Sequence, residues 1–191
     1  NHQEPDQVPL DLGATVVTGI HIQAYRRLRE HLQLPRREPV LDHLYQQLAK
    51  VDDDLLDQLQ VDVRSISAHA PRQQAELIQT SEDGEYFQYY DDFGVGWQMP
   101  TDGGMYYDMF DHPLSGEISA EQIAAYALPD PTDPRRFIGL RESAKKILRE
   151  ENRALTVGNM CSGIFELMMY TRGYYDGYLS WGDHQPTTRQ L

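Results

Sequence analysis

Five residues carry side chains that could do chemistry, and each stands near the carboxyl end of a predicted strand or on the helix that follows one. They are Asp11, His69, Asn159, Cys161 and Tyr170. An imidazole binds metal ions and transfers protons near neutral pH, and a thiolate is a nucleophile. Catalytic groups of parallel-stranded barrels sit at the carboxyl ends of the strands. The positions of these residues therefore indicate one candidate site.

We predict that His69 and Tyr170 are catalytic, and that Asp11, Asn159, Cys161 and Tyr170 bind substrate. Three of them have a structural alternative. His69 can be a solvated loop histidine, and Tyr170 a core tyrosine whose hydroxyl is satisfied. Cys161 can be a small buried residue. Because Cys161 is the one cysteine, no disulfide and no CxxC zinc site can form within the chain.

No metal ligands are predicted in this chain. Asp111 and His112 precede Pro113, a pattern that indicates a turn rather than half of a ligand set. The acidic run 52–54 stands where a helix should begin, and carboxylates there complement the helix dipole. We therefore interpret the run as capping rather than metal-binding.

Alternating strands and helices must position these residues. Short apolar runs predict core strands at 8–12, 60–66 and 153–158. Capping residues and apolar spacing predict helices from Thr18 to Leu32, from Pro39 to Leu48, from Ser119, from Asp133 to Leu148, and from Ser162 to Arg172. This alternation is typical of a parallel sheet, although three strands are too few to close a barrel of eight.

A β-rich insertion interrupts the pattern at about 85–110. Its aromatic residues, the turn at Asp91-Asp92 and the glycines at 94 and 96 predict a β-hairpin. Gly103-Gly104 introduces a third strand of that small sheet. We assign residues 1–181 to one domain and 182–191 to a polar tail.

The charge of the chain excludes several classes of partner. A net charge of −13 argues against nucleic acid and against an anionic membrane surface. The apolar runs are too short to span a bilayer. The N-terminal residues lack a signal-peptide pattern, which favours a cytoplasmic location. Since the first residue is Asn and not Met, we expect further residues upstream.

Several segments, in their order and spacing, resemble the uroporphyrinogen decarboxylase superfamily. The resemblance covers nearly the whole chain and is carried by residues 8–35, 59–66, 91–97, 130–145 and 157–173. It implies an α/β fold, the first part of a TIM-type (β/α)8 barrel about twice this length. Tyr170 matches the family's substrate-contacting tyrosine, and His69 falls near its second-strand aspartate.

The resemblance is closer to the cobalamin-linked methyltransferase branch than to the true decarboxylase. The decarboxylase opens with P-x-W-x-M-R-Q-A-G-R, whose arginines bind substrate carboxylates. The matching stretch here, PLDLGATVVT at 9–18, contains no arginine. The implied partners are a small molecule, a tetrapyrrole or a corrinoid protein, and a homodimer is an option. Corrinoid and zinc would belong to a longer version. The alternatives are a decarboxylase and a non-catalytic truncated protein.

Overall fold

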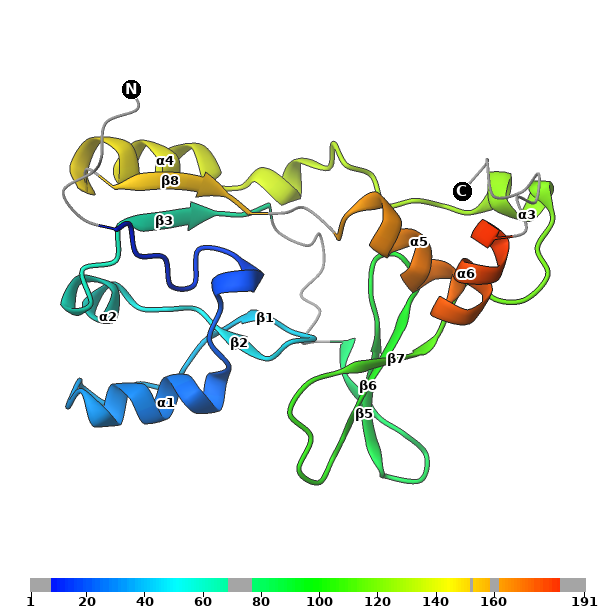
Figure 1. Ribbon diagram of the computed structural model, residues 1–191, viewed down its shortest axis with the longest axis horizontal. Helices are drawn as coiled ribbons and strands as arrows, with labels where there is room; N and C mark the ends of the chain where they lie inside the picture. Colours follow the sequence, from blue (N-terminus) through cyan, green and yellow to red (C-terminus); the bar gives the residue numbers. More distant parts are fainter. Residues whose placement is uncertain (1–7, 69–76, 152, 159–161, 183–191) are drawn as a thin grey trace. The chain divides into compact units, whose positions relative to one another are not determined.

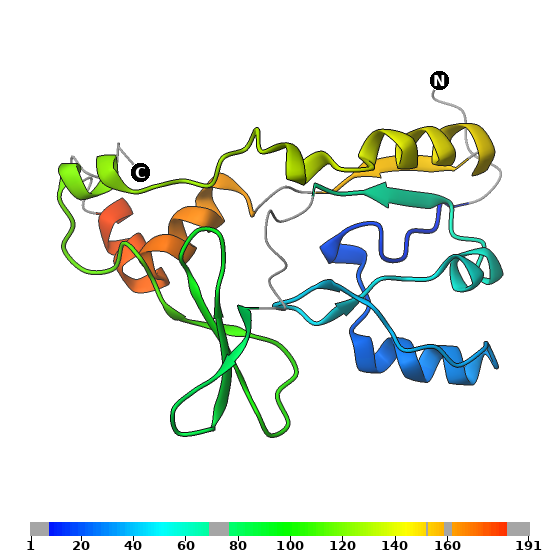
Figure 2. The ribbon, with the colours of Figure 1, turned by 180° about the vertical axis from the view of Figure 1, so that it is seen from behind.

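The computed structural model describes residues 8–68, 77–151, 153–158 and 162–182. Its contacts divide the chain into two compact units that alternate along the sequence. The first unit holds Asn1–His69 and Phe137–Met160, and the second holds Ala70–Arg136 and Cys161–Leu191. Both combine helices with small open sheets (Figures 1 and 2), so the described part is mixed α/β and contains no closed barrel.

The first unit opens with the 3-10 turn η1 (Val16–Thr18) and helix α1 (Ile22–His31). α1 confirms the first predicted helix, but its N-cap is His21 and not Thr18. The Nδ1 atom of His21 accepts a hydrogen bond from the Gln23 amide at 3.2 Å. The core of this unit forms where Tyr25 of α1 meets Ala49 and Leu55, all of them buried.

The helix predicted from Pro39 is wrong. That segment forms the antiparallel strands β1 (Leu41–His43) and β2 (Leu48–Ala49). The Lys50 amide donates to the Val40 carbonyl at 2.8 Å and closes the hairpin. The Ala49 amide donates to the Ile20 carbonyl at 2.9 Å, so pairing with a distant segment decides the conformation.

The strand predicted at 8–12 is also wrong. Leu10 makes two strand-like contacts, because its carbonyl accepts from the Asp62 amide and its amide donates to the Asp62 carboxylate, each at 2.9 Å. The chain then turns at Gly13, whose φ is +79°. An added Cβ at Gly13 would lie 2.6 Å from a methyl carbon of Val51, so the backbone of Gly13 packs closely against the Val51 side chain.

Two parallel strands form the centre of the first unit. β3 (Val63–Ile66) pairs with β8 (Ala154–Val157), with Val63 opposite Ala154 and Ile66 opposite Val157. This pairing confirms two of the three predicted strands and their direction. Helix α2 (Asp53–Gln58) precedes β3 and begins after Asp52, as the acidic run predicts.

The long helix predicted from Asp133 is interrupted. It divides into η3 (Pro134–Phe137), α4 (Leu140–Lys146) and the π-helical turn η4 (Ile147–Glu151). The break occurs at Gly139, which adopts a left-handed φ of 75°. Figure 1 shows α4 beside β3 and β8, with η4 leading into β8.

The second unit holds a four-stranded antiparallel sheet in the order β4-β5-β6-β7. Its strands are β4 (Gln79–Thr80), β5 (Tyr86–Tyr90), β6 (Gly96–Pro100) and β7 (Asp108–Asp111). The predicted hairpin and third strand are confirmed. Helix α3 (Ala120–Ala125) follows with Ser119 as N-cap, also as predicted.

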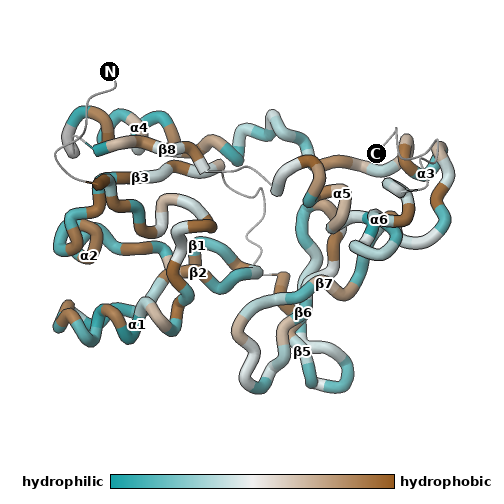
Figure 3. Tube along the Cα trace, viewed as in Figure 1, coloured by the Kyte–Doolittle hydropathy of each residue, from teal (hydrophilic) through white to brown (hydrophobic). Residues whose placement is uncertain are grey.

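Two consecutive helices complete the second unit. α5 (Ile164–Arg172) confirms the predicted helix, whereas α6 (Tyr174–Gly182) was not predicted. Met169 of α5 is buried, as are Trp97 and Tyr89 of the sheet. In Figure 3 polar and apolar segments alternate along both units. No helix in the described ranges is long and apolar enough to cross a membrane.

Candidate functional site

The carboxyl ends of β3 and β8 meet at one edge of the parallel pair. The Gly158 amide donates to the Ile66 carbonyl at 2.8 Å, which extends the pairing one residue beyond β8. An added Cβ at Gly158 would lie 2.0 Å from Ser67 Oγ and 3.1 Å from Ser67 Cβ. The absence of a side chain at 158 therefore lets the two segments that leave the strands approach closely.

Three predicted site residues follow these strand ends in the sequence. His69 comes three residues after β3, and Asn159 and Cys161 come two and four residues after β8. All three lie outside the described residues. Their roles stay predictions, and the described part of the edge consists of Ser67, Ala68 and Gly158.

Asp11 lies in the turn between Leu10 and η1. Its Oδ1 atom accepts a hydrogen bond from the Ala14 amide at 3.2 Å, and the residue is half-buried. Its neighbour Leu10 bonds to Asp62, the residue just before β3. Asp11 therefore lies next to the residue that contacts the amino end of β3, and its own carboxylate stabilises a local turn. Substrate binding by Asp11 stays a prediction.

Tyr170 belongs to the second unit and packs against the antiparallel sheet. Its ring meets the Trp97 ring edge-on, with centroids 5.6 Å apart and planes at 88°. Its backbone carbonyl contacts His112 Nδ1 at 2.7 Å. Burial raises the pKa of the nearby Tyr174, and electrostatic interactions with Tyr170 and Glu166 add to that rise. Tyr170 is thus a half-buried member of an aromatic and acidic group, while Asp11 belongs to the other unit.

Asp91 positions the tryptophan that Tyr170 contacts. Its carboxylate accepts hydrogen bonds from the amides of Phe93 (2.8 Å) and Val95 (3.0 Å) and from Trp97 Nε1 (2.9 Å). Burial raises the pKa of Asp91, and these three donors partly oppose the rise. Sequence reasoning identified the turn at Asp91 but missed this link to Tyr170, because β6 and α5 are about 70 residues apart and meet by packing.

His112 was interpreted as part of a turn, and the structure adds a second role. A carbonyl can only accept, so Nδ1 of His112 donates to Tyr170 and Nε2 is left as the acceptor in the neutral ring. The ring lies against Gly173, where an added Cβ would be 3.0 Å from His112 Cδ2. His112 therefore ties the end of β7 to the end of α5.

The described residues contain no cluster of metal-ligating side chains. Within the described ranges, no three His, Cys, Asp or Glu side chains gather in a way that could hold a metal ion. The expectations of zinc and a corrinoid stay predictions.

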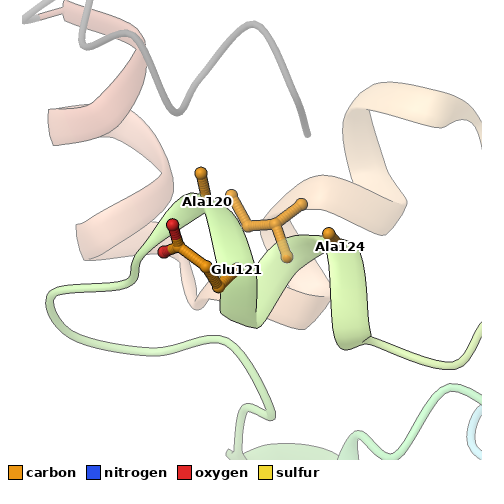
Figure 4. A pocket seen from close by; sticks show the side chains of 4 residues that line it. Ala120, Glu121 and Ala124 are labelled. Carbon is orange, nitrogen blue, oxygen red and sulfur yellow. The ribbon is translucent and has the colours of Figure 1, made fainter.

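The surface of the described residues includes two hollows. One, of about 590 Å³, is bordered by Ala120, Glu121, Ile123 and Ala124 of α3 (Figure 4). Its described lining is apolar apart from one carboxylate, so it lacks a pair of groups for acid–base chemistry. The other, of about 300 Å³, is lined by Asp53, Asp57, Arg64, Lys146 and Arg153 in the first unit. Asp57 and Arg64 already pair at 3.0 Å.

No protein-family model, no curated protein and no solved structure matches the chain.

Proposed function

We propose that this chain is part of a (β/α)8 barrel enzyme of the uroporphyrinogen decarboxylase type, acting in cobalamin-associated methyl transfer. The observation that supports the proposal is the parallel pairing of β3 with β8. Along the sequence, α4 and η4 precede β8 and α5 follows it, which is the order of elements in a β/α barrel.

The strand ends supply the chemical part of the proposal. A parallel pair directs both carboxyl ends to one edge, and barrels bind substrate there. His69, Asn159 and Cys161 follow these ends in the sequence. An imidazole, an amide and a thiol would thus share one edge, with the thiol as nucleophile and the imidazole as proton carrier.

The free side of β8 supports a larger sheet. The amides of Ala154 and Gly158 point to β3, so Leu155 and Val157 direct their backbone groups to the opposite side. No described strand pairs with that side. The Val157 side chain is 69% exposed, unusual for a strand inside a parallel sheet. Further strands of a barrel would pair with these backbone groups and cover Val157.

Methyl transfer is favoured over decarboxylation by the residues of the opening segment. Recognition of several carboxylates calls for arginines, and residues 9–18 contain none. The described residues offer no ligand set for zinc, so we derive no step through a bound metal or corrinoid.

A pair of titrations tests the proposal. The chain is titrated with methylcobalamin, followed by its visible absorbance, and with uroporphyrin, followed by porphyrin fluorescence. We expect saturable binding of methylcobalamin, weakened at least tenfold in His69→Ala and unchanged in the control His31→Ala, which alters an exposed residue of α1. Binding of uroporphyrin alone would move the assignment to decarboxylation. Flat curves for both ligands would reject the enzyme proposal and leave a non-catalytic protein.

A further inference from the structure

The helices α5 and α6 carry an unusual set of exposed aromatic residues. We call this set the aromatic face; it consists of Phe165, Tyr174, Tyr175, Tyr178 and Trp181. Each exposes between 48% and 77% of its surface. Soluble proteins expose single apolar residues routinely, but a contiguous apolar patch of this kind marks an interaction site.

Four of the five rings of the aromatic face, those other than Tyr175, form a connected group. Phe165 of α5 contacts Tyr178 and Trp181 of α6, with centroid distances of 6.4 Å and 5.9 Å. Tyr174 stacks on Tyr178 at 6.3 Å. The two helices are joined by Gly173 alone and pack side by side in Figures 1 and 2. The face is therefore held by two packed helices and is not a set of independent side chains.

The charged groups of these helices are already engaged within the chain. The Glu166 carboxylate accepts from the Gly163 amide at 3.3 Å, and the Asp176 carboxylate accepts from the Gly116 amide at 2.6 Å. The Arg172 guanidinium is buried and donates to Ser180 Oγ at 2.8 Å and to the Gly116 carbonyl at 2.8 Å. The face thus offers no cation to an acidic partner, and the two carboxylates beside it, which keep their charge, each already accept a hydrogen bond from within the chain.

We propose that the aromatic face is the contact surface between two copies of this chain. A two-fold interface presents the same patch from both sides, so the patch must complement itself. Uncharged rings and tyrosine hydroxyls, which both donate and accept, meet that requirement.

The area of the face is close to what a dimer needs. A fully covered aromatic residue buries about 150–250 Å², so five residues with these exposures offer on the order of 600 Å². Ile164 and Leu179, which are 90% and 48% exposed, extend it. A standard interface takes about 800 Å² from each partner.

The charge of the protein predicts the salt response of this dimer. Each copy carries a net charge of −13, while the five residues of the aromatic face carry none. Two such copies repel each other at low ionic strength, and salt screens that repulsion. Added salt should therefore strengthen the dimer, whereas it would weaken an interface held by ion pairs.

Analytical ultracentrifugation of the whole chain tests the proposal. We expect the 22.0 kDa monomer to give way to a species of twice that mass between about 1 and 100 µM, the weak end for interfaces of this size. Raising NaCl from about 0.05 M to about 0.5 M should lower the dissociation constant. Tyr178→Glu and Tyr175→Glu should each raise it at least tenfold.

Tyr106→Glu is the matched control, because Tyr106 is 57% exposed against 59% for Tyr178 but lies before β7, outside the aromatic face. It should leave the dissociation constant unchanged, and circular dichroism should show all variants folded. A monomer at all concentrations would overturn the proposal, as would a dimer that resists both substitutions in the face. Binding of the monomer to phosphatidylcholine vesicles would also overturn it, by assigning the face to a lipid surface.

Discussion

Gly158 and Ser67 approach each other where β8 and β3 end, and a Cβ added to Gly158 would lie 2.0 Å from Ser67 Oγ. The contact joins residues that are 91 positions apart and borders the edge to which the candidate chemistry is assigned. It makes the parallel pairing of the strands testable by substitution.

Gly158→Ala should reduce the free energy of unfolding by about 1–2 kcal/mol, the cost of overpacking a close contact. Ser67→Ala removes the nearest atom, so the double variant should regain part of that loss. Urea denaturation measures all three proteins. Gly182→Ala is the control, since nothing lies within 4 Å of the added carbon and alanine favours the helix. Full stability of Gly158→Ala would contradict the strand-end geometry.

Arg29→Met should destabilise the first unit by about 3 kcal/mol, because it leaves the Asp54 carboxylate without the buried charge that it pairs with. Arg29 is 3% exposed and donates to both carboxylate oxygens of Asp54, at 2.8 Å and 2.9 Å. Thermal and urea unfolding measure the loss. Arg26→Met, one turn earlier and pairing with Glu38 on the surface, should cost no more than about 0.5 kcal/mol. Equal effects of the two substitutions would show that the buried network contributes little.

The stability of the chain should fall between about pH 4 and pH 2 through Asp54. The Arg29 guanidinium lowers the pKa of Asp54 from 3.8 to about 2. A depressed pKa means that the fold favours the ionised form, so this contribution is present above about pH 4 and is lost as the pH falls toward 2.

Asp54→Asn should remove that part of the pH dependence, whereas Asp53→Asn, which alters a neighbouring acid in the same helical turn, should retain it. Urea midpoints between pH 2 and pH 5 give the comparison. Identical pH profiles for Asp54→Asn and the wild type would refute the assignment.

Asp91→Asn should destabilise the hairpin of the second unit by about 1–3 kcal/mol, since the amide nitrogen replaces the oxygen that accepts from Trp97 Nε1. Asp92→Asn is the neighbouring control and should have a smaller effect, because Asp92 reaches Arg136 only at 3.7 Å. Urea unfolding followed by tryptophan emission measures both. If Asp92→Asn proved the more damaging, the role given to Asp91 would be wrong.

A substitution in the aromatic face should affect self-association but not the stability of the monomer. Tyr178→Glu should change the free energy of unfolding of the monomer by no more than about 0.5 kcal/mol, as expected for an exposed position. The same substitution should raise the dissociation constant of the dimer at least tenfold. Denaturation at about 1 µM and sedimentation at about 100 µM separate the two effects. A large loss of stability at the low concentration would place Tyr178 in the core instead.

Local signals were sufficient where a segment's own residues determine its conformation. Ser119 begins α3, the acidic run at 52–54 begins α2, and Asp91 with Gly94 forms the hairpin turn, all as predicted. In each case the hydrogen bonds that select the conformation join residues a few positions apart, so the sequence alone determined these elements.

Only the tertiary structure decided the elements that depend on distant partners. Residues 40–49 have helical spacing but form a hairpin, because Ala49 and Leu48 pair with the segment before α1. β3 pairs with β8 across 91 residues, and the contacts of Tyr170 with Trp97 and His112 likewise join distant segments. Such contacts depend on which surfaces pack together, and the spacing of residues along the chain does not predict which distant surfaces those are.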